Sequence, residues 1–348
     1  MGNARNLADN LPLTGASNNR NIIINGEFLI DERHDGANHG VTAGSDFFAD
    51  RWGFYTSSSA KNEYTATTEV VGDGPDGIEK SLKWTTASVT GSGIPATGET
   101  IFRHKIEGYN INLVNYGSAN AQNLTLSFYV KASIAGNYGL CAQFEDSGST
   151  NRYNQRSYTV NSANTWERKT VLIPANTANA MKNKTNNMGM AINWDFGEGA
   201  TYSGSVTGNW QSAYINGLSG GVKLAENNGA TWQITGVQLE IGNKATEFER
   251  ESVGAALAKC QRYFYSWTSS GLSDNIYIRS PYSTGTPPNS SASAEYTFPV
   301  TMRANPTMTT TYNYSRFTAS IHNAVAQIGT TSANNAYAST EWQADAEI

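Results

Sequence analysis

The alternation of apolar and polar residues predicts a chain built mainly from β-strands. The clearest case is residues 124–131, LTLSFYVK, where every second residue from Leu124 to Val130 is apolar. Successive side chains of a strand point to opposite faces, so this spacing places the four apolar residues on one face. The same period recurs at 140–144 and 188–196. Short strands separated by Gly-, Asn- and Ser-rich loops indicate antiparallel sheets packed as a sandwich.

Residues 231–267 are the stretch around which the rest of the chain is predicted to be organised. Their first part reads as the closing strand of a large sandwich, with apolar residues in two groups that keep a two-residue period but differ in phase: Trp232 and Ile234, then Val237, Leu239 and Ile241. A β-bulge at Thr235-Gly236 would absorb one extra residue and return all five side chains to the core face.

The second part of this stretch predicts a short helix that leads into a smaller β region. Ser252 is the expected N-cap. The apolar helical residues are spaced by four, three and four, which makes one stripe: Val253, Leu257, Cys260 and Phe264. We expect Trp232, Cys260 and Phe264 to be buried.

Four parts of the chain follow from these patterns. The fold class is all-β, with a large β-sandwich joined by a short helix to a second, smaller β-sandwich. The parts are an extended arm at 1–20, the large sandwich at 21–250, the linking helix at 251–265 and the small sandwich at 266–348. We expect a first strand at 21–28, no helix before residue 252, and last strands drawn from 316–328 and 336–348.

Composition narrows the classes of partner. The 348 residues carry a net charge of -5, which argues against a nucleic-acid backbone as partner. Cys141 and Cys260 lie on apolar patterns, so we expect two buried free thiols rather than a disulfide. No apolar run approaches the ~20 residues of a membrane span, and residues 1–20 lack the apolar core of a signal peptide. We therefore expect synthesis in a cytoplasm without membrane insertion.

Catalytic motifs are absent from the sequence. None of the four histidines adjoins a serine or cysteine in a nucleophile motif, and no phosphate-binding glycine loop follows a strand. Glycoside hydrolysis needs two carboxylates, and the candidate pairs are Glu145/Asp146 and Asp195/Glu198. Both pairs flank predicted strand ends, where solvated turn carboxylates are expected. We therefore predict that the chain is not an enzyme.

A structural calcium ion is the one cofactor that the sequence suggests. Carboxylates and backbone carbonyls are the ligands that Ca²⁺ prefers. The best-spaced set is Asp73, Asp76 and Glu79, in the turn-rich loop that follows Val71. The alternative is that this loop is an ordinary turn without a metal.

Surface aromatic residues are the remaining candidates for recognition. Sugars have apolar faces that stack on Trp and Tyr, and hydroxyls that suit polar side chains. The large sandwich offers three candidates in a Gly-rich region: Tyr202, Trp210 and Tyr214. The C-terminal part offers Tyr282, Tyr312 and Tyr314. Core packing or subunit contact is the alternative role for each of them.

Several segments resemble a domain of bacteriophage tail fibres and other virion appendage proteins. They occur in the same order over nearly residues 21–312: NIIINGEF (21–28), ADRW (49–52), LTLSFYVKAS (124–133), WQITGVQLEIG (232–242) and ATEFERESVGAALAKCQRYF (245–264). FPVTMRANPTMT (298–309) resembles the start of the small β domain that often follows CQRYF in these proteins. CQRYF and FPVTMR together make the resemblance fairly specific.

The resemblance implies a jelly-roll like that of carbohydrate-binding modules, followed by a small sandwich and assembled as a homotrimer on a virion. It also implies recognition of a host surface rather than catalysis. Related sugar-binding modules often carry a calcium-ligating acidic residue directly after the Asn-Gly-x-Phe turn, where this chain has Leu29. The motif residues are expected to be scaffold positions: Asp50, Arg51, Trp52, Gln261, Arg262 and Arg303.

These observations lead to the hypothesis of a non-enzymatic, trimeric tail fibre or fibre tip that adheres to a host-surface glycan or receptor. Residues 1–20 would dock it to other virion proteins. One alternative is a purely structural virion component, such as a capsid decoration or a baseplate part, without a sugar ligand. The other is a glycan-degrading tailspike.

Overall fold

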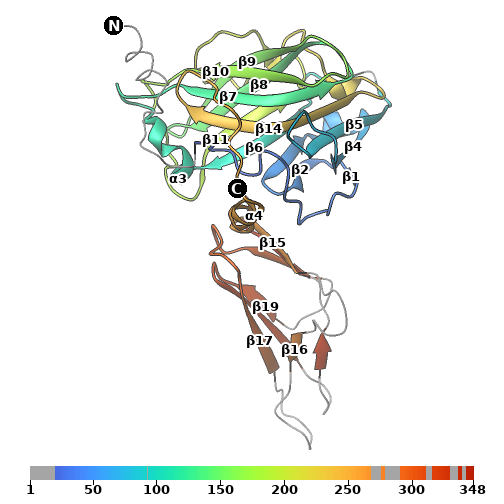
Figure 1. The fold of residues 1–348 in the computed structure, drawn as a ribbon, viewed down its shortest axis with the longest axis vertical. Coiled ribbons are helices and arrows are strands. Elements are labelled where there is room, and N and C mark those ends of the chain that lie inside the picture. The colour runs from blue at the N-terminus through green and yellow to red at the C-terminus, as the bar shows by residue number, and fades with distance from the viewer. Residues whose placement is uncertain are drawn as a thin grey trace, which may run out of the picture.

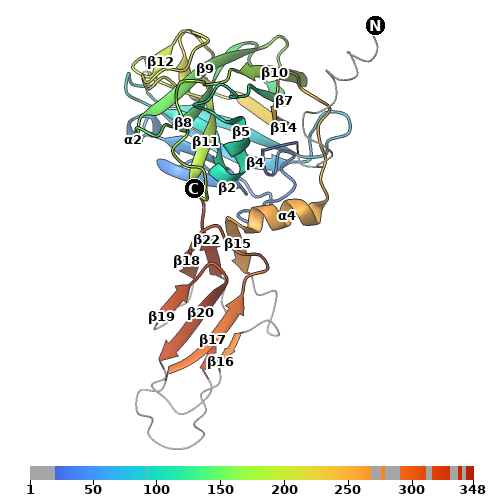
Figure 2. The same ribbon diagram turned by 90° about the vertical axis from the view of Figure 1, so that its left-hand side faces the viewer.

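The computed structural model describes residues 20–91, 93–267, 276–278, 291–310, 316–329, 336–338 and 342–348. Two six-stranded sheets form a large sandwich, and small sheets from the C-terminal part extend away from it (Figures 1 and 2). The predicted all-β fold class is therefore confirmed. None of the helices in these ranges is long and apolar enough to cross a bilayer.

Each sheet of the sandwich is antiparallel throughout. Sheet A has the order β1 (His39–Gly40), β4 (Tyr64–Val71), β5 (Ser81–Val89), β14 (Thr231–Ile241), β7 (Leu124–Ala132) and β10 (Glu167–Ile173). Sheet B has the order β2 (Gly44–Ala49), β3 (Trp52–Thr56), β6 (Thr100–Glu107), β11 (Met188–Asp195), β8 (Gly136–Glu145) and β9 (Asn151–Val160). Neighbouring strands are thus often far apart in sequence.

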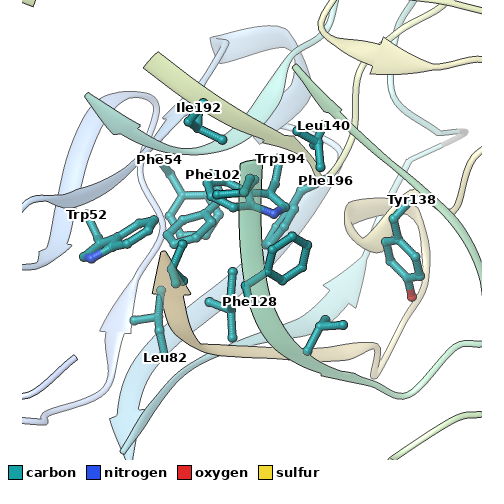
Figure 3. Close-up of a cluster of buried hydrophobic side chains, with 14 of the residues drawn as sticks. Trp52, Phe54, Leu82, Phe102, Phe128, Tyr138, Leu140, Ile192, Trp194 and Phe196 are labelled. Atoms are coloured by element: carbon teal, nitrogen blue, oxygen red, sulfur yellow. The ribbon is translucent and has the colours of Figure 1, made fainter. Parts of the chain in front are cut away.

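The core between the sheets is rich in aromatic rings (Figure 3). Trp52 stacks on Phe102 with ring centroids 5.1 Å apart, and Phe196 meets the edge of Trp232 at 4.8 Å. The alternating residues from Leu124 to Val130 all point into this core. The two-residue period therefore identified the buried face correctly.

The closing strand contains the predicted bulge. Its register against β7 shifts between Thr235 and Gln238, and Gly236 takes a φ of 58° there. Four of the five apolar side chains are buried: Trp232, Ile234, Val237 and Leu239. The prediction was wrong for Ile241, which is 37% exposed because the strand runs past the core at its end.

The predicted strand at 21–28 is instead irregular. Asn25 and Phe28 have positive φ values of 58° and 56°. The Asn25 side chain accepts a bond from Ile30 N at 3.1 Å and donates to Ile30 O at 2.8 Å. Asparagine side chains compete in this way with strand pairing, which explains the error.

Short helices also precede residue 252, contrary to expectation. They are α2 (Ser58–Lys61), α3 (Gly108–Ile111), η1 (Asn112–Val114) and η2 (Leu224–Glu226). The Ser57 side chain caps α2 by accepting a bond from Ala60 N at 3.3 Å. Each of these helices spans only three or four residues, too few for an apolar period to reveal it.

The helix after the sandwich, α4 (Val253–Gln261), begins at the predicted cap, where Ser252 Oγ accepts a bond from Ala255 N at 3.3 Å. Cys260 packs with Ile24, Ile30 and Tyr263, and both thiols of the chain are buried and free, as predicted. The predicted stripe is incomplete, because Val253 in the first turn is 60% exposed. Trp232, Cys260 and Phe264 are buried as expected.

Three small sheets follow α4 in the residues that the structure describes. They are β15 (Phe264–Trp267), β22 (Trp342–Asp345) and β18 (Thr307–Thr310); β17 (Ser291–Thr297), β20 (Asn323–Gly329) and β19 (Arg316–Ala319); and β16 (Ile276–Ile278) with β21 (Ala336–Ala338). Tyr265, Phe298, Met302 and Trp342 belong to a core that the first two of these sheets share. The segments predicted to supply the last strands do so.

Motif arginines hold these small sheets to the sandwich. Arg303 donates to Ala346 O at 2.7 Å and, across the joint, to Asn186 O at 2.8 Å. Arg262 pairs with Glu107 of β6 at 2.7 Å. These side chains make structural contacts, as expected for scaffold positions.

Candidate functional site

Two of the candidate tyrosines, Tyr202 and Tyr214, lie together. Their rings meet at 90° with centroids 4.9 Å apart, and both side chains are half-buried. They belong to residues 196–223, here called the covering segment, which crosses the outer face of sheet B near β8 and β9 (Figure 2). Tyr214 also meets Tyr153 of β9 at 5.2 Å.

The covering segment is held to sheet B by polar contacts. Gln211 and Tyr153 exchange two backbone hydrogen bonds of 2.8 and 2.9 Å. Asn193 of β11 donates to Asn216 Oδ1 at 3.1 Å. Within the segment, β12 (Ser203–Gly204) pairs in parallel with β13 (Gly217–Leu218). These bonds fix the two tyrosines relative to the strands below them.

Glu99, directly before β6, connects the tyrosines to β3 of sheet B. The hydroxyls of Tyr214 and of Tyr55, from β3, lower the pKa of its carboxyl. Burial raises the pKa of Glu99, while these two hydroxyls and the nearby Arg103 guanidinium oppose the rise. Arg103 also lies 5.4 Å from the centre of the Tyr55 ring and donates to Ser45 Oγ at 2.6 Å. We call Tyr55, Glu99, Arg103, Tyr202 and Tyr214 the tyrosine patch.

The tyrosine patch combines two kinds of contact. Its three tyrosine rings are only half-buried, so each keeps some apolar surface in contact with water. A carboxylate accepts hydrogen bonds, a guanidinium donates them, and phenol hydroxyls do both. Apolar ring faces beside such groups suit a ligand that is itself amphipathic, and a sugar ring is one.

Trp210 does not belong to the patch. Its ring packs on Phe144 at 4.9 Å and on Tyr116 at 5.6 Å, and its Nε1 donates to Pro174 O at 2.8 Å. These contacts anchor the covering segment to the core cluster. Among the other candidates, Tyr282, Tyr312 and Tyr314 lie outside the described residues.

Asp195 and Glu198 are not the solvated turn residues that we expected. Both are buried, because the covering segment lies over the end of β11. Asp195 accepts bonds from Glu198 N and Leu218 N at 2.9 Å, and burial raises its pKa to about 6. Neither Glu198 carboxylate oxygen has a hydrogen-bond partner among the described residues. Burial, and next the Asp195 charge, raise its pKa well above the usual value.

The second carboxylate pair matches the expectation only in part, because Glu145 ends β8 and is half-buried, whereas Asp146 lies in the turn but is buried. Glu145 pairs with Lys182 at 2.7 Å, and Asp146 pairs with Arg152 at 2.7 Å. Asp146 also accepts bonds from the amides of Gly148 and Thr150. In neither pair are two carboxylates free and facing solvent.

The suggested calcium site is not formed. No three His, Cys, Asp or Glu side chains come together as a metal site in the part of the chain that the structure describes, so Asp73, Asp76 and Glu79 do not do so. Asp73 is instead bound by Lys131 and by Gln233 Nε2 at 3.1 Å. Asp76 and Glu79 are exposed, as in an ordinary turn.

Comparison with protein-family models and with curated proteins found no match. Among solved structures, the enzymatically active domain of tailspike protein 4 from bacteriophage CBA120 matches 65% of this chain, with 11% identity and a TM-score of 0.32. The match spans only 22% of that tailspike chain. A putative sugar-binding protein from Bacteroides thetaiotaomicron matches 64% of this chain and 99% of its own, with 13% identity and a TM-score of 0.33.

A family 11 carbohydrate-binding module from Clostridium thermocellum, in complex with a β-1,3-1,4-mixed-linked tetrasaccharide, is also similar. It covers 60% of this chain and 99% of its own, with 10% identity and a TM-score of 0.30. Identities and TM-scores this low carry no conclusion about function. The function of the chain is therefore inferred from its own residues.

Proposed function

We propose that this chain is a non-enzymatic virion protein of a bacteriophage that adheres to a host-surface glycan through the tyrosine patch. The observation that supports it most is the arrangement around Glu99. Three half-buried tyrosines and a half-buried guanidinium lie on the outer face of sheet B around the Glu99 carboxylate, which is only 7% exposed. Such a surface stacks on sugar rings and exchanges hydrogen bonds with their hydroxyls.

Adhesion is a better proposal than hydrolysis for the same surface. Glycoside hydrolysis needs an acid and a second carboxylate on either side of the scissile bond. Asp195 uses both oxygens to accept backbone amides, and Glu198 is completely buried beneath the covering segment. Neither carboxylate is placed to reach a polysaccharide.

The virion role and the trimer rest on the resemblance of the motifs to those of tail fibres. Residues of ADRW, CQRYF and FPVTMR, far apart in sequence, meet at the joint, where Arg51, Tyr263 and Arg303 contact one another's segments. In this proposal residues 1–20 dock the protein to other virion proteins. Three copies in a homotrimer, and several trimers on a particle, give avidity from weak sites.

A glycan array tests the proposal with the wild type and three variants. We expect Tyr202→Ala and Glu99→Gln to weaken binding about tenfold, or ~1.4 kcal/mol. The control is Tyr109→Ala, which removes a tyrosine that is 62% exposed on α3, outside the patch. Melting temperatures show whether each variant remains folded.

Other outcomes would replace the proposal. A wild-type protein that binds no glycan at high valency would favour the purely structural role, as a capsid decoration or baseplate part. Cleaved oligosaccharides after incubation with host polysaccharide would show a glycan-degrading enzyme. A stable monomer in light scattering would contradict the proposal of a trimeric fibre.

A further inference from the structure

The outer face of sheet A carries a row of polar side chains that ends in a tryptophan. The strand registers align Glu69 of β4, Lys83 of β5, Gln233 of β14 and Lys131 of β7. Trp166, directly before β10, continues the row, since the Lys131 ammonium lies 5.2 Å from its ring centre. We call these five residues the Trp166 row. It lies on the opposite side of the sandwich from the covering segment.

Polar contacts hold the indole of Trp166 in place. Its Nε1 donates to Asp73 Oδ1 at 3.4 Å, and Asp73 in turn binds Lys131 and Gln233. The hydrogen bond from Lys131 lowers the pKa of Asp73, so this carboxylate is charged. Trp166 remains half-buried, and the Asp73 side chain is 47% exposed. The row therefore presents an oriented indole beside a carboxylate that solvent can reach.

The charges along the row balance. Lys83 pairs with Glu69 at 2.9 Å, and Lys131 pairs with Asp73. A balanced surface offers no net attraction for a polyanion such as nucleic acid or a sulfated glycan. It does offer donors and acceptors for neutral hydroxyl groups. The next row of the sheet adds three hydroxyl-bearing residues: Thr67, Thr85 and Thr231.

The length of the row defines the size of ligand. Five positions on neighbouring strands span roughly 19 Å, at about 4.8 Å between strands. A single monosaccharide would contact only one end, whereas a short linear oligosaccharide would extend along the row and meet Asp73 above the Gln233 side chain, which is 6% exposed. We propose that the Trp166 row is a second saccharide-binding surface, which takes a neutral linear oligosaccharide with one sugar ring stacked on Trp166.

The experiment titrates the 348-residue protein calorimetrically with cellotetraose, xylotetraose, mannotetraose and tetra-N-acetylchitotetraose, with a heparin tetrasaccharide as the anionic comparison. At least one neutral tetrasaccharide is expected to bind. Trp166→Ala is expected to weaken that binding about tenfold, and Trp166→Phe to keep most of it, because an aromatic face is retained. Light scattering measures the assembly mass of each variant in parallel.

The results separate this surface from the tyrosine patch. Binding that is weakened by Trp166→Ala but unchanged in Tyr202→Ala supports the Trp166 row, whether or not the tyrosine patch binds sugar. The proposal is overturned if Trp166→Ala leaves all neutral tetrasaccharide binding unchanged, or if only the heparin tetrasaccharide binds. It is also overturned if Trp166→Ala lowers the assembly mass, because the row would then be a subunit contact.

Discussion

The Arg51 guanidinium pairs with the Glu347 carboxylate across 296 residues of sequence. Both side chains are almost fully buried, at 1% and 4% exposure. Arg51 also lies over the Tyr263 ring, 3.5 Å from its centre, and Arg33 approaches the same carboxylate at 3.3 Å. The ion pair therefore holds the C-terminal segment against the large sandwich.

Replacing Glu347 should uncouple the small sheets from the sandwich. Glu347→Gln leaves the Arg51 charge buried without its counter-charge, and breaking one side of a buried pair costs about 3 kcal/mol or more. We expect the free energy of unfolding to fall by that amount in urea, and amide exchange in β22 to accelerate. The control is Glu145→Gln, whose ion pair with Lys182 is solvent-exposed and should be worth under about 1 kcal/mol. Equal effects of the two variants would contradict this role.

The bulge of the closing strand should be intolerant of a side chain. Gly236 has a φ of 58°, and an added Cβ would lie 2.9 Å from Ile78 Cδ1 and 3.0 Å from Tyr129 Cδ2. We expect Gly236→Ala to cost about 1–3 kcal/mol of unfolding free energy, from backbone strain and crowding. Gly254→Ala is the matched control, because it lies in α4 with open space around it and should be neutral or stabilising by up to about 1 kcal/mol. If both variants melt like the wild type, the bulge is not strained by a side chain.

The buried Glu198 carboxyl should make stability depend on pH. Its folded pKa is raised by burial, so the stability that it contributes is complete below its unfolded pKa of about 4.3 and is lost as the pH rises through the folded pKa. Glu198→Gln does not titrate. Its stability advantage over the wild type should therefore grow between pH 5 and pH 9, by at most about 1.4 kcal/mol per pH unit.

Urea titrations at each pH measure this difference. Asp195 titrates in both proteins, and burial, the main cause of its raised pKa, is common to the wild type and the variant. An advantage that stays constant over the range, or shrinks as the pH rises, would show that Glu198 is not buried in its neutral form.

Local patterns predicted the fold where the local period decides the structure. The strand at Leu124–Ala132 and the bulge at Gly236 follow from a two-residue alternation that needs no knowledge of the partner strands. The prediction of a strand at 21–28 failed because the Asn25 side chain bonds to the backbone. The prediction that Ile241 is buried failed because a two-residue period that continues does not reveal where the core ends.

The candidate site was only partly predictable for a different reason. Composition and a Gly-rich setting pointed to Tyr202 and Tyr214, but Tyr55, Glu99 and Arg103 were missed. Those three come from β3, from β6 and from the residue directly before β6, which reach the tyrosines only through the strand order of sheet B. The two-residue alternation along β6 could have identified Arg103 as a residue on the outward face. It could not have identified Arg103 as a neighbour of Tyr214.

Trp210 and Tyr202 are eight positions apart, yet substituting Trp210 should lower stability, whereas substituting Tyr202 should weaken glycan binding. Trp210→Ala removes packing on Phe144 and the bond to Pro174 O, so we expect a loss of about 2 kcal/mol or more in unfolding free energy. Tyr202 has a half-buried ring at the patch, and Tyr202→Ala should instead reduce glycan binding with little loss of stability. Urea unfolding and the glycan array, applied to both variants, measure the two effects. If Trp210→Ala stays as stable as the wild type but loses glycan binding, the tyrosine patch is assigned to the wrong residues, and Trp210 is the sugar contact.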